Sequence, residues 1–186
     1  MQLLRDRGYA DCRMEDIANI ANVSLKTVYN YFPTKQSILV DLLREDRLIM
    51  RSAYEEIANN PPDDLAEALS RIIHADIGDV ITPQKKKLWR ELLAAEIRTH
   101  ESADDDFEKN RQIYTHYVKL ILLHFRRKGK LSPKVNIDVA IEMIYGIMAY
   151  NFRQYCAIET MKPEDLLAVT RRQMKLLLVP WSPDGE

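Results

Sequence analysis

The amino-acid sequence predicts an all-α fold. Of its 186 residues, 46% are hydrophobic, whereas only 5 are glycines and 8 are prolines. A chain of many short strands would need more turn residues than this. Between the prolines, apolar residues recur at spacings of three and four, as they do on one face of an amphipathic helix. The sequence therefore indicates helices around one or two compact cores.

The charge and cysteine content narrow the class of protein. There are 27 Lys and Arg against 28 Asp and Glu, so the net charge of −1 does not draw the whole chain to nucleic acid or to an anionic membrane. Cys12 and Cys156 lie too far apart to suggest a disulfide framework or a metal knuckle. No leader opens the sequence, and its longest uncharged apolar stretch, 143–152, is shorter than the roughly 20 residues that span a bilayer. We therefore expect a cytoplasmic protein that does not enter membranes.

The first elements lie between Met14 and Lys35, where the sequence fits two short helices joined by a sharp turn. Asn22 stands at the turn, where a residue that tolerates a positive φ is needed. Ser24 follows and can cap the second helix. Ala18 is small where the two helices approach each other. This is the helix-turn-helix pattern, whose second helix enters the DNA major groove. The core between the helices is expected from Ile17, Ala21, Val23, Val28 and Tyr31.

One long helix should follow at 34–58, because its apolar residues keep helical spacing throughout. At about 1.5 Å per residue it would be about 36 Å long, enough to join two subdomains. We accordingly divide the chain into a helix-turn-helix domain, 1–46, and a larger helical domain, 47–186. The helix-turn-helix domain is predicted to have three helices, of which the first is truncated.

Five further helices complete the second domain. Acidic residues at 63–64 favour the start of a helix that runs to about Gly78, and Thr82 with Pro83 begins one that ends near Thr99. Residues 101–106 form a loop and the start of the next helix.

The last three helices have clear boundaries as well. The helix from 107 closes with three cations and Gly129, an expected helix stop. Asn136 can cap a helix of about 136–156 that is apolar over more than half of its circumference, and the last helix begins at Pro163 and ends before Pro180.

Several short motifs lie within residues 8–42. They are Gly8-Tyr9, Ile17-Ala18, Val23-Ser24, Thr27-Val28-Tyr29 and Tyr31-Phe32-Pro33-Thr34-Lys35. Together they resemble the signature of the tetracycline-repressor (TetR) family of transcriptional regulators. The resemblance implies homodimeric all-α regulators, usually repressors, whose C-terminal domain binds a small inducer and whose last two helices form the dimer interface.

Two departures from the family pattern affect the DNA-binding half. Arg13 stands where relatives have a Ser or Thr cap, so it cannot cap a helix but can reach a phosphate. The family's leading helix begins further before Gly8 than this sequence does. Residues 1–51 carry eight Lys or Arg and seven Asp or Glu, so their charge is only +1, and binding by phosphate neutralisation alone would be modest.

The candidate DNA-binding residues lie around the second motif helix. Thr27 and Asn30 can read base edges, whereas Lys26, Tyr29 and other long side chains can hold phosphates. The alternatives are that these residues form a solvated helix face and that Tyr31 belongs mainly to the core. The full set is Arg13, Leu25, Lys26, Thr27, Tyr29, Asn30, Tyr31 and Lys35.

A small-molecule site is predicted between the middle helices, where aromatic and apolar residues carry a few polar tips. For any single member, an ordinary core position is the alternative, because such residues at helical spacing are often core. The predicted ligand-binding residues are Trp89, Leu93, Glu96, His100, Tyr114, Tyr117, Val118, Ile121, Met143, Ile147 and Tyr150.

The last two helices are the candidate dimer interface. Gly146 in the middle of a helix costs about 1 kcal/mol relative to alanine, and close approach of a second helix would compensate. The alternative is a monomeric core. The predicted interface, around a two-fold axis, comprises Ala140, Gly146, Ala149, Leu166, Leu167, Thr170, Met174 and Leu177.

We therefore expect a ligand-responsive transcriptional regulator, most simply a repressor. It would bind a palindromic operator as a homodimer and be released by a small, largely apolar effector. An alternative is the same fold acting through protein partners. We expect no enzyme, because no Glu-x-x-His pair, Gly-rich phosphate loop or nucleophile motif is present. We also expect no cofactor, and no metal, because two histidines eight residues apart are weak evidence for zinc.

Overall fold

The computed structural model describes residues 12–77, 80–99 and 106–183. Over these ranges it contains eight α-helices, one short 3₁₀ helix and no strand, which confirms the all-α prediction. No described helix is both long and apolar enough to cross a membrane. The elements are α2 (Met14–Ile20), α3 (Leu25–Tyr31), α4 (Lys35–Asn59), α5 (Leu65–Ile77), α6 (Pro83–Thr99), α7 (Asp106–Arg127), α8 (Ile137–Ala157), α9 (Pro163–Leu178) and η1 (Val179–Trp181).

Helices α2 and α3 form the predicted helix-turn-helix, which we call the helix-turn-helix lobe (residues 12–32). Asn22 adopts a φ of 53° at the turn. The Ser24 side chain caps α3 by accepting a hydrogen bond from the Thr27 backbone N–H at 3.1 Å. Both local predictions are confirmed. The predicted leading helix before residue 12 and the loop at 101–106 lie wholly or mostly outside the described residues.

The small core of this lobe differs from the prediction. Ala21, Val23 and Tyr31 are exposed, and Tyr31 retains 77% of its accessible surface. At the end of α3, it is Phe32, four residues after the buried Val28, that packs against the core of the lobe. The rest of the core comes from outside the motif, because the lobe packs on α4 and α6. Its buried members are Cys12, Met14, Ala18, Val28, Ile38, Leu88 and Leu92.

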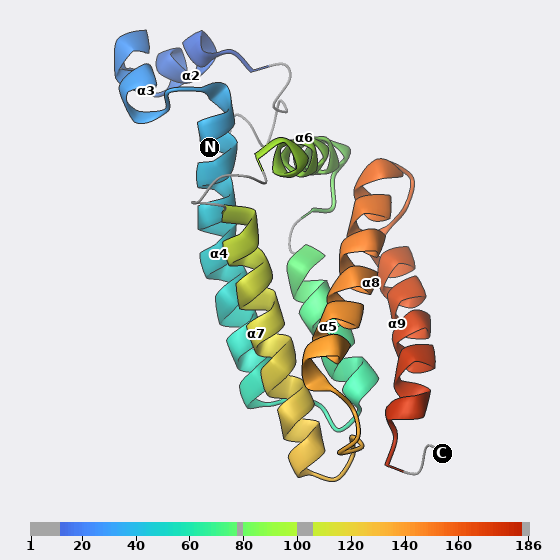
Figure 1. The fold of residues 1–186 in the computed structure, drawn as a ribbon. Helices are drawn as coiled ribbons and strands as arrows, with labels where there is room; N and C mark the ends of the chain where they lie inside the picture. The colour runs from blue at the N-terminus through green and yellow to red at the C-terminus, as the bar shows by residue number, and fades with distance from the viewer. Residues whose placement is uncertain (1–11, 78–79, 100–105, 184–186) are drawn as a thin grey trace.

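Helix α4 runs unbroken from the lobe into the helical body, beside α7 (Figure 1). Thr34 caps it by accepting from the Ser37 N–H at 3.1 Å. Its 25 residues agree with the prediction of one long helix to within a residue at each end. The proposed domain boundary at 46/47 falls inside this helix, so the two halves share it.

Helices α4, α5, α7, α8 and α9 build the body around one large core, while α6 lies across the end that faces the lobe (Figure 1). Asn136 caps α8, accepting from two backbone N–H groups at 3.1 and 3.3 Å. Gly129, with a φ of 67°, follows the end of α7. The caps that the sequence predicts therefore set the ends of both helices.

Helix α6 is fastened to the end of α8 by a buried lysine. The Lys86 side chain is 2% exposed. Its Nζ donates to the backbone carbonyls of Ile158 at 2.8 Å, Glu159 at 3.3 Å and Met161 at 2.5 Å. Nζ also lies 3.9 Å from the centre of the Tyr155 ring. A cation at a helix C-terminus is electrostatically favourable, so this contact fixes where α6 begins relative to α8.

Candidate functional site

The outer face of α3 carries polar side chains that are free to meet a ligand. Lys26, Tyr29 and Asn30 are exposed and share one side of the helix. Thr27 is half-buried, and its Oγ1 lies 2.8 Å from Ser24 Oγ, so it also stabilises the start of α3. Leu25 packs partly against the core of the lobe. The structure thus brings three of the predicted DNA-binding side chains onto one open surface.

The remaining predicted DNA contacts flank that surface. Arg13 is exposed at the start of α2, where Asp16 Oδ2 accepts from the Arg13 backbone N–H at 2.9 Å. The arginine side chain itself has only donors, so it does not cap the helix. Tyr31 projects from the end of α3, and Lys35 is half-buried at the first residue of α4. All the predicted positions therefore lie on or next to the lobe.

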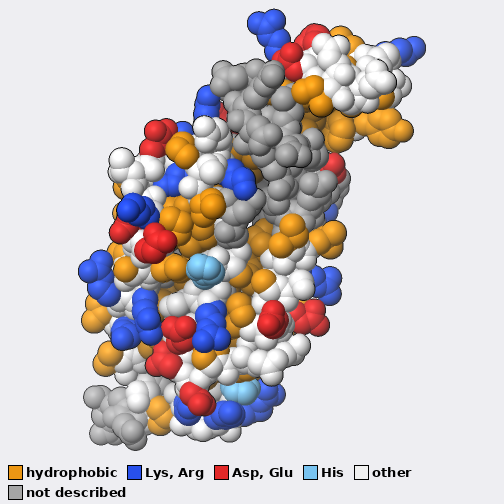
Figure 2. All heavy atoms as spheres, turned by 180° about the vertical axis from the view of Figure 1, so that it is seen from behind, with side chains coloured by type: hydrophobic (Ala, Val, Ile, Leu, Met, Phe, Trp, Pro, Cys, Tyr) orange, Lys and Arg blue, Asp and Glu red, His pale blue; other side chains and the backbone are white. Residues whose placement is uncertain are grey.

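The lobe projects from the helical body, and on the face shown in Figure 2 acidic and basic side chains are interspersed over that body rather than segregated. Among the described side chains of this face, no continuous basic patch is visible on the body.

A cavity of about 100 Å³ lies among α4, α5, α6, α7 and α8. Three of the predicted ligand-binding residues, Trp89, Leu93 and Tyr114, line it. Its walls are mostly apolar and aromatic, with a few polar groups, as is usual for small-molecule sites. The lining residues are Met50, Asp76, Trp89, Leu93, Asn110, Arg111, Tyr114, Tyr145, Met148, Ala149, Phe152 and Arg153.

Two polar atoms of the cavity wall are buried without a hydrogen-bond partner. They are Oδ2 of Asp76 and the hydroxyl of Tyr114, whose side chain is only 3% exposed. Burial raises the pKa of the Asp76 carboxyl well above its usual value, because the charged form loses its hydration. Burial, followed by the nearby Asp76, likewise raises the pKa of Tyr114. These two groups form the polar point of an otherwise apolar site.

Aromatic rings and two arginines complete the cavity. Trp89 and Phe152 meet edge to face with ring centres 5.1 Å apart, and the Tyr114 and Tyr145 rings lie 5.8 Å apart. Arg111 is exposed at the rim, where its Nε and Nη2 donate to the two carboxylate oxygens of Glu108, each at 2.6 Å. Arg153 is also exposed. The arginines are therefore at the mouth, and the unpartnered groups are inside.

Several predicted ligand-binding residues lie elsewhere, and those expectations are corrected. Tyr117, Val118 and Ile121 are buried in the main core, as the alternative interpretation allowed, and Ile147 packs partly against the same core. Met143 and Tyr150 point outward. The reason is the rotation of α8, which turns Ile144 and Met148 inward and the residues of the opposite face outward. The Glu96 side chain and His100 lie outside the described residues.

Sequence reasoning missed most of the polar lining of the cavity. Asp76 carried the clearest signal, since it is a lone carboxylate in the last turn of a helix that otherwise buries Ile72, Ile73 and Ile77. The other lining residues carried no comparable signal, because nothing in the spacing alone shows which helix faces another. Asn110, Arg111, Tyr145 and Phe152 are of this kind.

The predicted dimer residues also require correction. Ala140, Leu166, Thr170 and Met174 are buried inside the protomer, because both helices turn their most apolar side toward its own core, and they cannot present a surface to a second chain. Leu167 and Leu177 are half-buried against the same core, and Ala149 lines the cavity.

A different stripe of α8 is exposed. It comprises Val139, Met143, Gly146 and Tyr150, and Met143 and Tyr150 are 46% and 59% exposed. A Cβ atom added at Gly146 would meet nothing within 4 Å. The glycine therefore packs closely against no described part of its own chain.

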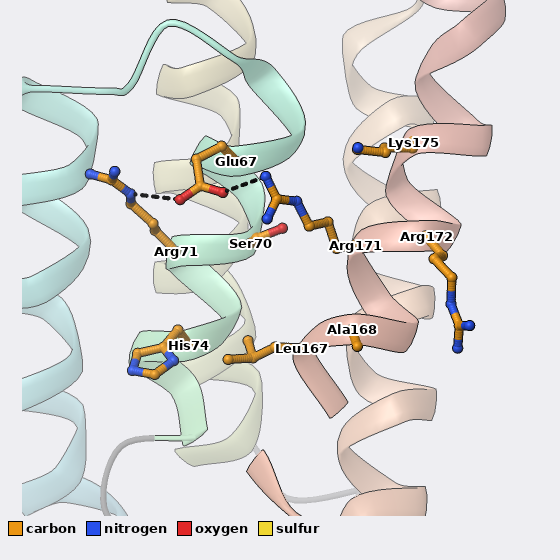
Figure 3. Close-up of a pocket in the computed structure, with 9 residues that line it drawn as sticks. All are labelled: Glu67, Ser70, Arg71, His74, Leu167, Ala168, Arg171, Arg172 and Lys175. Carbon is orange, nitrogen blue, oxygen red and sulfur yellow. Dashed lines mark hydrogen bonds and ion pairs between the residues drawn. The ribbon is translucent and has the colours of Figure 1, made fainter. Parts of the chain in front are cut away.

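A second hollow, of about 520 Å³, opens on the outside between α5 and α9 (Figure 3). Glu67 bridges Arg71 and Arg171, with N–O distances of 3.2 Å to each. Arg172 and Lys175 of α9 line the same hollow (Figure 3). Its charged residues are exposed and partly neutralised, so it is a solvated groove rather than an enclosed site. Among the described residues, no cluster of three or more His, Cys, Asp or Glu side chains could hold a metal ion.

The sequence is similar to those of several known proteins. Residues 1–42 match the model described as "Bacterial regulatory proteins, tetR family". A 63-residue segment is 41% identical to the HTH-type transcriptional regulator EthR of Mycobacterium tuberculosis, covering 33% of this chain but only 28% of EthR. The uncharacterised HTH-type transcriptional regulator YdeS of Bacillus subtilis is 24% identical over 150 residues, which cover 80% of this chain and 71% of YdeS.

Solved structures share the fold along the whole chain. A TetR-family transcriptional regulator from Pectobacterium atrosepticum superposes with a TM-score of 0.75 at 17% identity, covering 100% of this chain and 91% of that one. Thermus thermophilus FadR, solved in complex with lauroyl-CoA, gives a TM-score of 0.66 at 20% identity, covering 96% and 89%. The N-terminal segment is thus similar to the TetR family of bacterial regulatory proteins, and the chain as a whole shares the fold of the solved TetR-family structures.

Proposed function

We propose that this protein is a ligand-responsive transcriptional regulator, in the simplest case a repressor, that binds a palindromic operator as a homodimer and leaves it when a small, largely apolar effector binds. One observation carries the proposal. Helix α6 buries Leu88 and Leu92 in the core of the helix-turn-helix lobe, while its Trp89 and Leu93 line the cavity. A molecule in the cavity therefore touches the helix on which the lobe rests.

The DNA contacts follow from the exposed face of α3. Asn30 and Thr27 are placed to read base edges in the major groove, and Leu25 can contact a thymine methyl group. Phosphates on either side are held by Arg13, Lys26, Tyr29, Tyr31 and Lys35. The relatives to which the chain is similar are named as transcriptional regulators, and we assign no catalytic role.

The homodimer is proposed to form through the exposed stripe of α8, with Leu176 of α9 beside it. Met143, Tyr150 and Leu176 are large hydrophobic side chains that remain exposed in the single chain. A two-fold axis would place each stripe against its copy, and Gly146 would let the helices approach closely. Two recognition helices can then meet half-sites about 34–36 Å apart.

Release from DNA needs an effector that binds better to the DNA-incompatible form, because only differential affinity shifts an equilibrium. A ligand against Trp89 would displace α6, and the lobe and α4 would move with it. The separation of the two recognition helices would change, and the match to the operator would be lost.

The test is fluorescence anisotropy of the full chain with DNA from its own promoter region. We expect salt-sensitive binding, since phosphate contacts release counterions. The double variant Tyr31→Ala and Lys35→Ala should lose at least tenfold in affinity, whereas Lys128→Ala, at the far end of α7, should bind like the wild type. Absence of salt-sensitive binding by the dimeric wild type would refute the proposal.

A second candidate function is action through a protein partner. It is favoured by the apolar side chains that the lobe leaves exposed, among them Ile20, Val23 and Tyr31. The same double variant discriminates between the two functions, because regulation that survives the loss of Tyr31 and Lys35 does not depend on these phosphate contacts.

A further inference from the structure

We propose that the effector is an organic cation, a protonated amine on a small aromatic or apolar body, whose ammonium group binds Asp76 and Tyr114 inside the cavity. The inference rests on the proposed function, in which this cavity is the effector site, and it names the chemical class of the effector.

The first argument is the unmet hydrogen-bonding capacity of the site. Asp76 Oδ2 and the Tyr114 hydroxyl are both buried and have no partner. Buried polar groups are nearly always paired, so an unpaired couple on a cavity wall points to a missing ligand. A primary ammonium has three donors and no acceptor, and can donate to a carboxylate oxygen and a phenol oxygen at once.

The second argument is the sign of the charge. Asp76 lies in the last turn of α5, next to its final residue Ile77. The carbonyl groups at a helix C-terminus carry a partial negative charge that favours cations. An ammonium group that binds here displaces the Asp76 proton to water, and the resulting carboxylate and the helix end both favour the cation. An anionic group at this point would meet Asp76, and a neutral tail would leave both polar atoms unpaired.

The arginines of the lining do not oppose this assignment. Arg111 and Arg153 are exposed at the mouth, where water screens them, and Arg111 is engaged by both oxygens of Glu108. An ammonium at Asp76 lies on the buried side of the cavity instead. The cation is therefore held where the carboxylate is and not where the guanidinium groups are.

The third argument is the size of the cavity and the aromatic character of the side chains that line it. The rings of Trp89, Tyr114, Tyr145 and Phe152 surround the space, and aromatic faces attract cations as well as apolar groups. The cavity of about 100 Å³ is smaller than the roughly 150 Å³ that takes up benzene, so a body of one ring fills it and extends toward its mouth. The site is therefore matched to a small aryl or alkyl amine.

Isothermal titration calorimetry of the full chain with three matched probes tests the class. Benzylamine, benzyl alcohol and benzoate share one ring and differ in charge. We expect benzylamine to bind at least tenfold more tightly than benzyl alcohol, and benzoate to bind most weakly. Equal affinities, tighter binding of benzoate, or no measurable binding of benzylamine at millimolar concentration would overturn the inference.

Substitutions locate the effect. Asp76→Asn should remove the tenfold preference for benzylamine and leave benzyl alcohol within threefold of its wild-type affinity. The matched control is Asp138→Asn, an exposed carboxylate on α8 that pairs with Lys119, and it should bind all three probes like the wild type. Tyr114→Phe should weaken benzylamine severalfold and keeps the assignment testable if Asp76→Asn does not fold. An undiminished preference in both folded variants would refute the site.

The DNA assay separates this inference from the function on which it rests. If benzylamine binds at Asp76 but the wild type shows no salt-sensitive operator binding, the proposed function fails and the ligand class stands. If operator binding is normal but the three probes bind alike, the ligand class fails and the regulator stands.

Discussion

Asp76 affects both the stability of the empty protein and the proposed binding of an effector. Its folded pKa is raised by burial, so between the unfolded value of 3.8 and the folded value the native state holds a proton that the unfolded chain has lost. Stability is therefore fully present below about pH 3.8 and decreases as the pH rises through this window. The other titratable groups that line the same cavity are Tyr114, Tyr145, Arg111 and Arg153.

Asp76→Asn cannot titrate, so its free energy of unfolding relative to the wild type should increase from pH 4 to pH 8. The maximum slope is about 1.4 kcal/mol per pH unit inside the window. Urea denaturation at several pH values measures the difference, and the exposed Asp138→Asn serves as the control. A difference that does not change with pH would show that Asp76 titrates normally in the folded chain.

Cys156 gives a second prediction at this scale. Burial raises the pKa of its thiol to about 12, against the lesser opposing effect of Lys86 and Arg90. Only the thiolate is reactive, and Cys12 is likewise a buried thiol outside any disulfide. We expect a thiol reagent at pH 7 to modify neither cysteine in the native protein and both in denaturant. Rapid labelling of the native chain at Cys156 would contradict the burial that the structure shows.

Among the elements, α6 has a buried polar attachment to the end of α8 through Lys86, beside the contact of Arg90 with the Cys156 carbonyl. Lys86→Met would leave three carbonyl groups at the end of α8 without their donor. We expect a loss of about 3 kcal/mol in the free energy of unfolding, the order found when one partner of a buried charged contact is removed. Chemical denaturation measures it, with Lys128→Met on the surface as the control. A loss below about 0.5 kcal/mol would mean that water replaces the lysine.

The elements themselves were predictable because their limits are local. Ser24, Gly129 and Asn136 act within a few residues of where they stand, and each marks a helix limit as expected. Which side of each helix faces the core, in contrast, is not determined by neighbouring residues in the sequence. The sequence of α8 is apolar on more than one side, and only packing decides that Ile144 turns inward and Tyr150 outward. For this reason the cavity was predicted on helices that line it but partly with residues that do not, and several of the predicted dimer residues are buried in the protomer.

For the whole molecule, the outward stripe of α8 predicts the assembly. Met143→Glu with Tyr150→Glu would place two like charges on each side of the proposed two-fold axis. We expect the wild type to be a dimer and the double variant a monomer in analytical ultracentrifugation, with operator affinity reduced at least tenfold. Leu120→Glu, which adds a charge at an exposed hydrophobic position of α7, is the control and should remain dimeric. A dimeric double variant would place the interface elsewhere.

The unbroken length of α4 also determines how far the lobe moves when the helix rotates about its far end. With 25 residues at 1.5 Å per residue, the helix is a rigid rod of about 37 Å that has the lobe at one end. A rotation of about 5° about its far end carries the near end through about 3 Å, roughly the rise of one base pair. Met50 in the cavity wall lies nine residues from that far end, so the same rotation moves it by only about 1 Å. In the proposed mechanism, an occupant no larger than one ring would need to shift its surroundings by only about that much to misalign a recognition helix by one base-pair step.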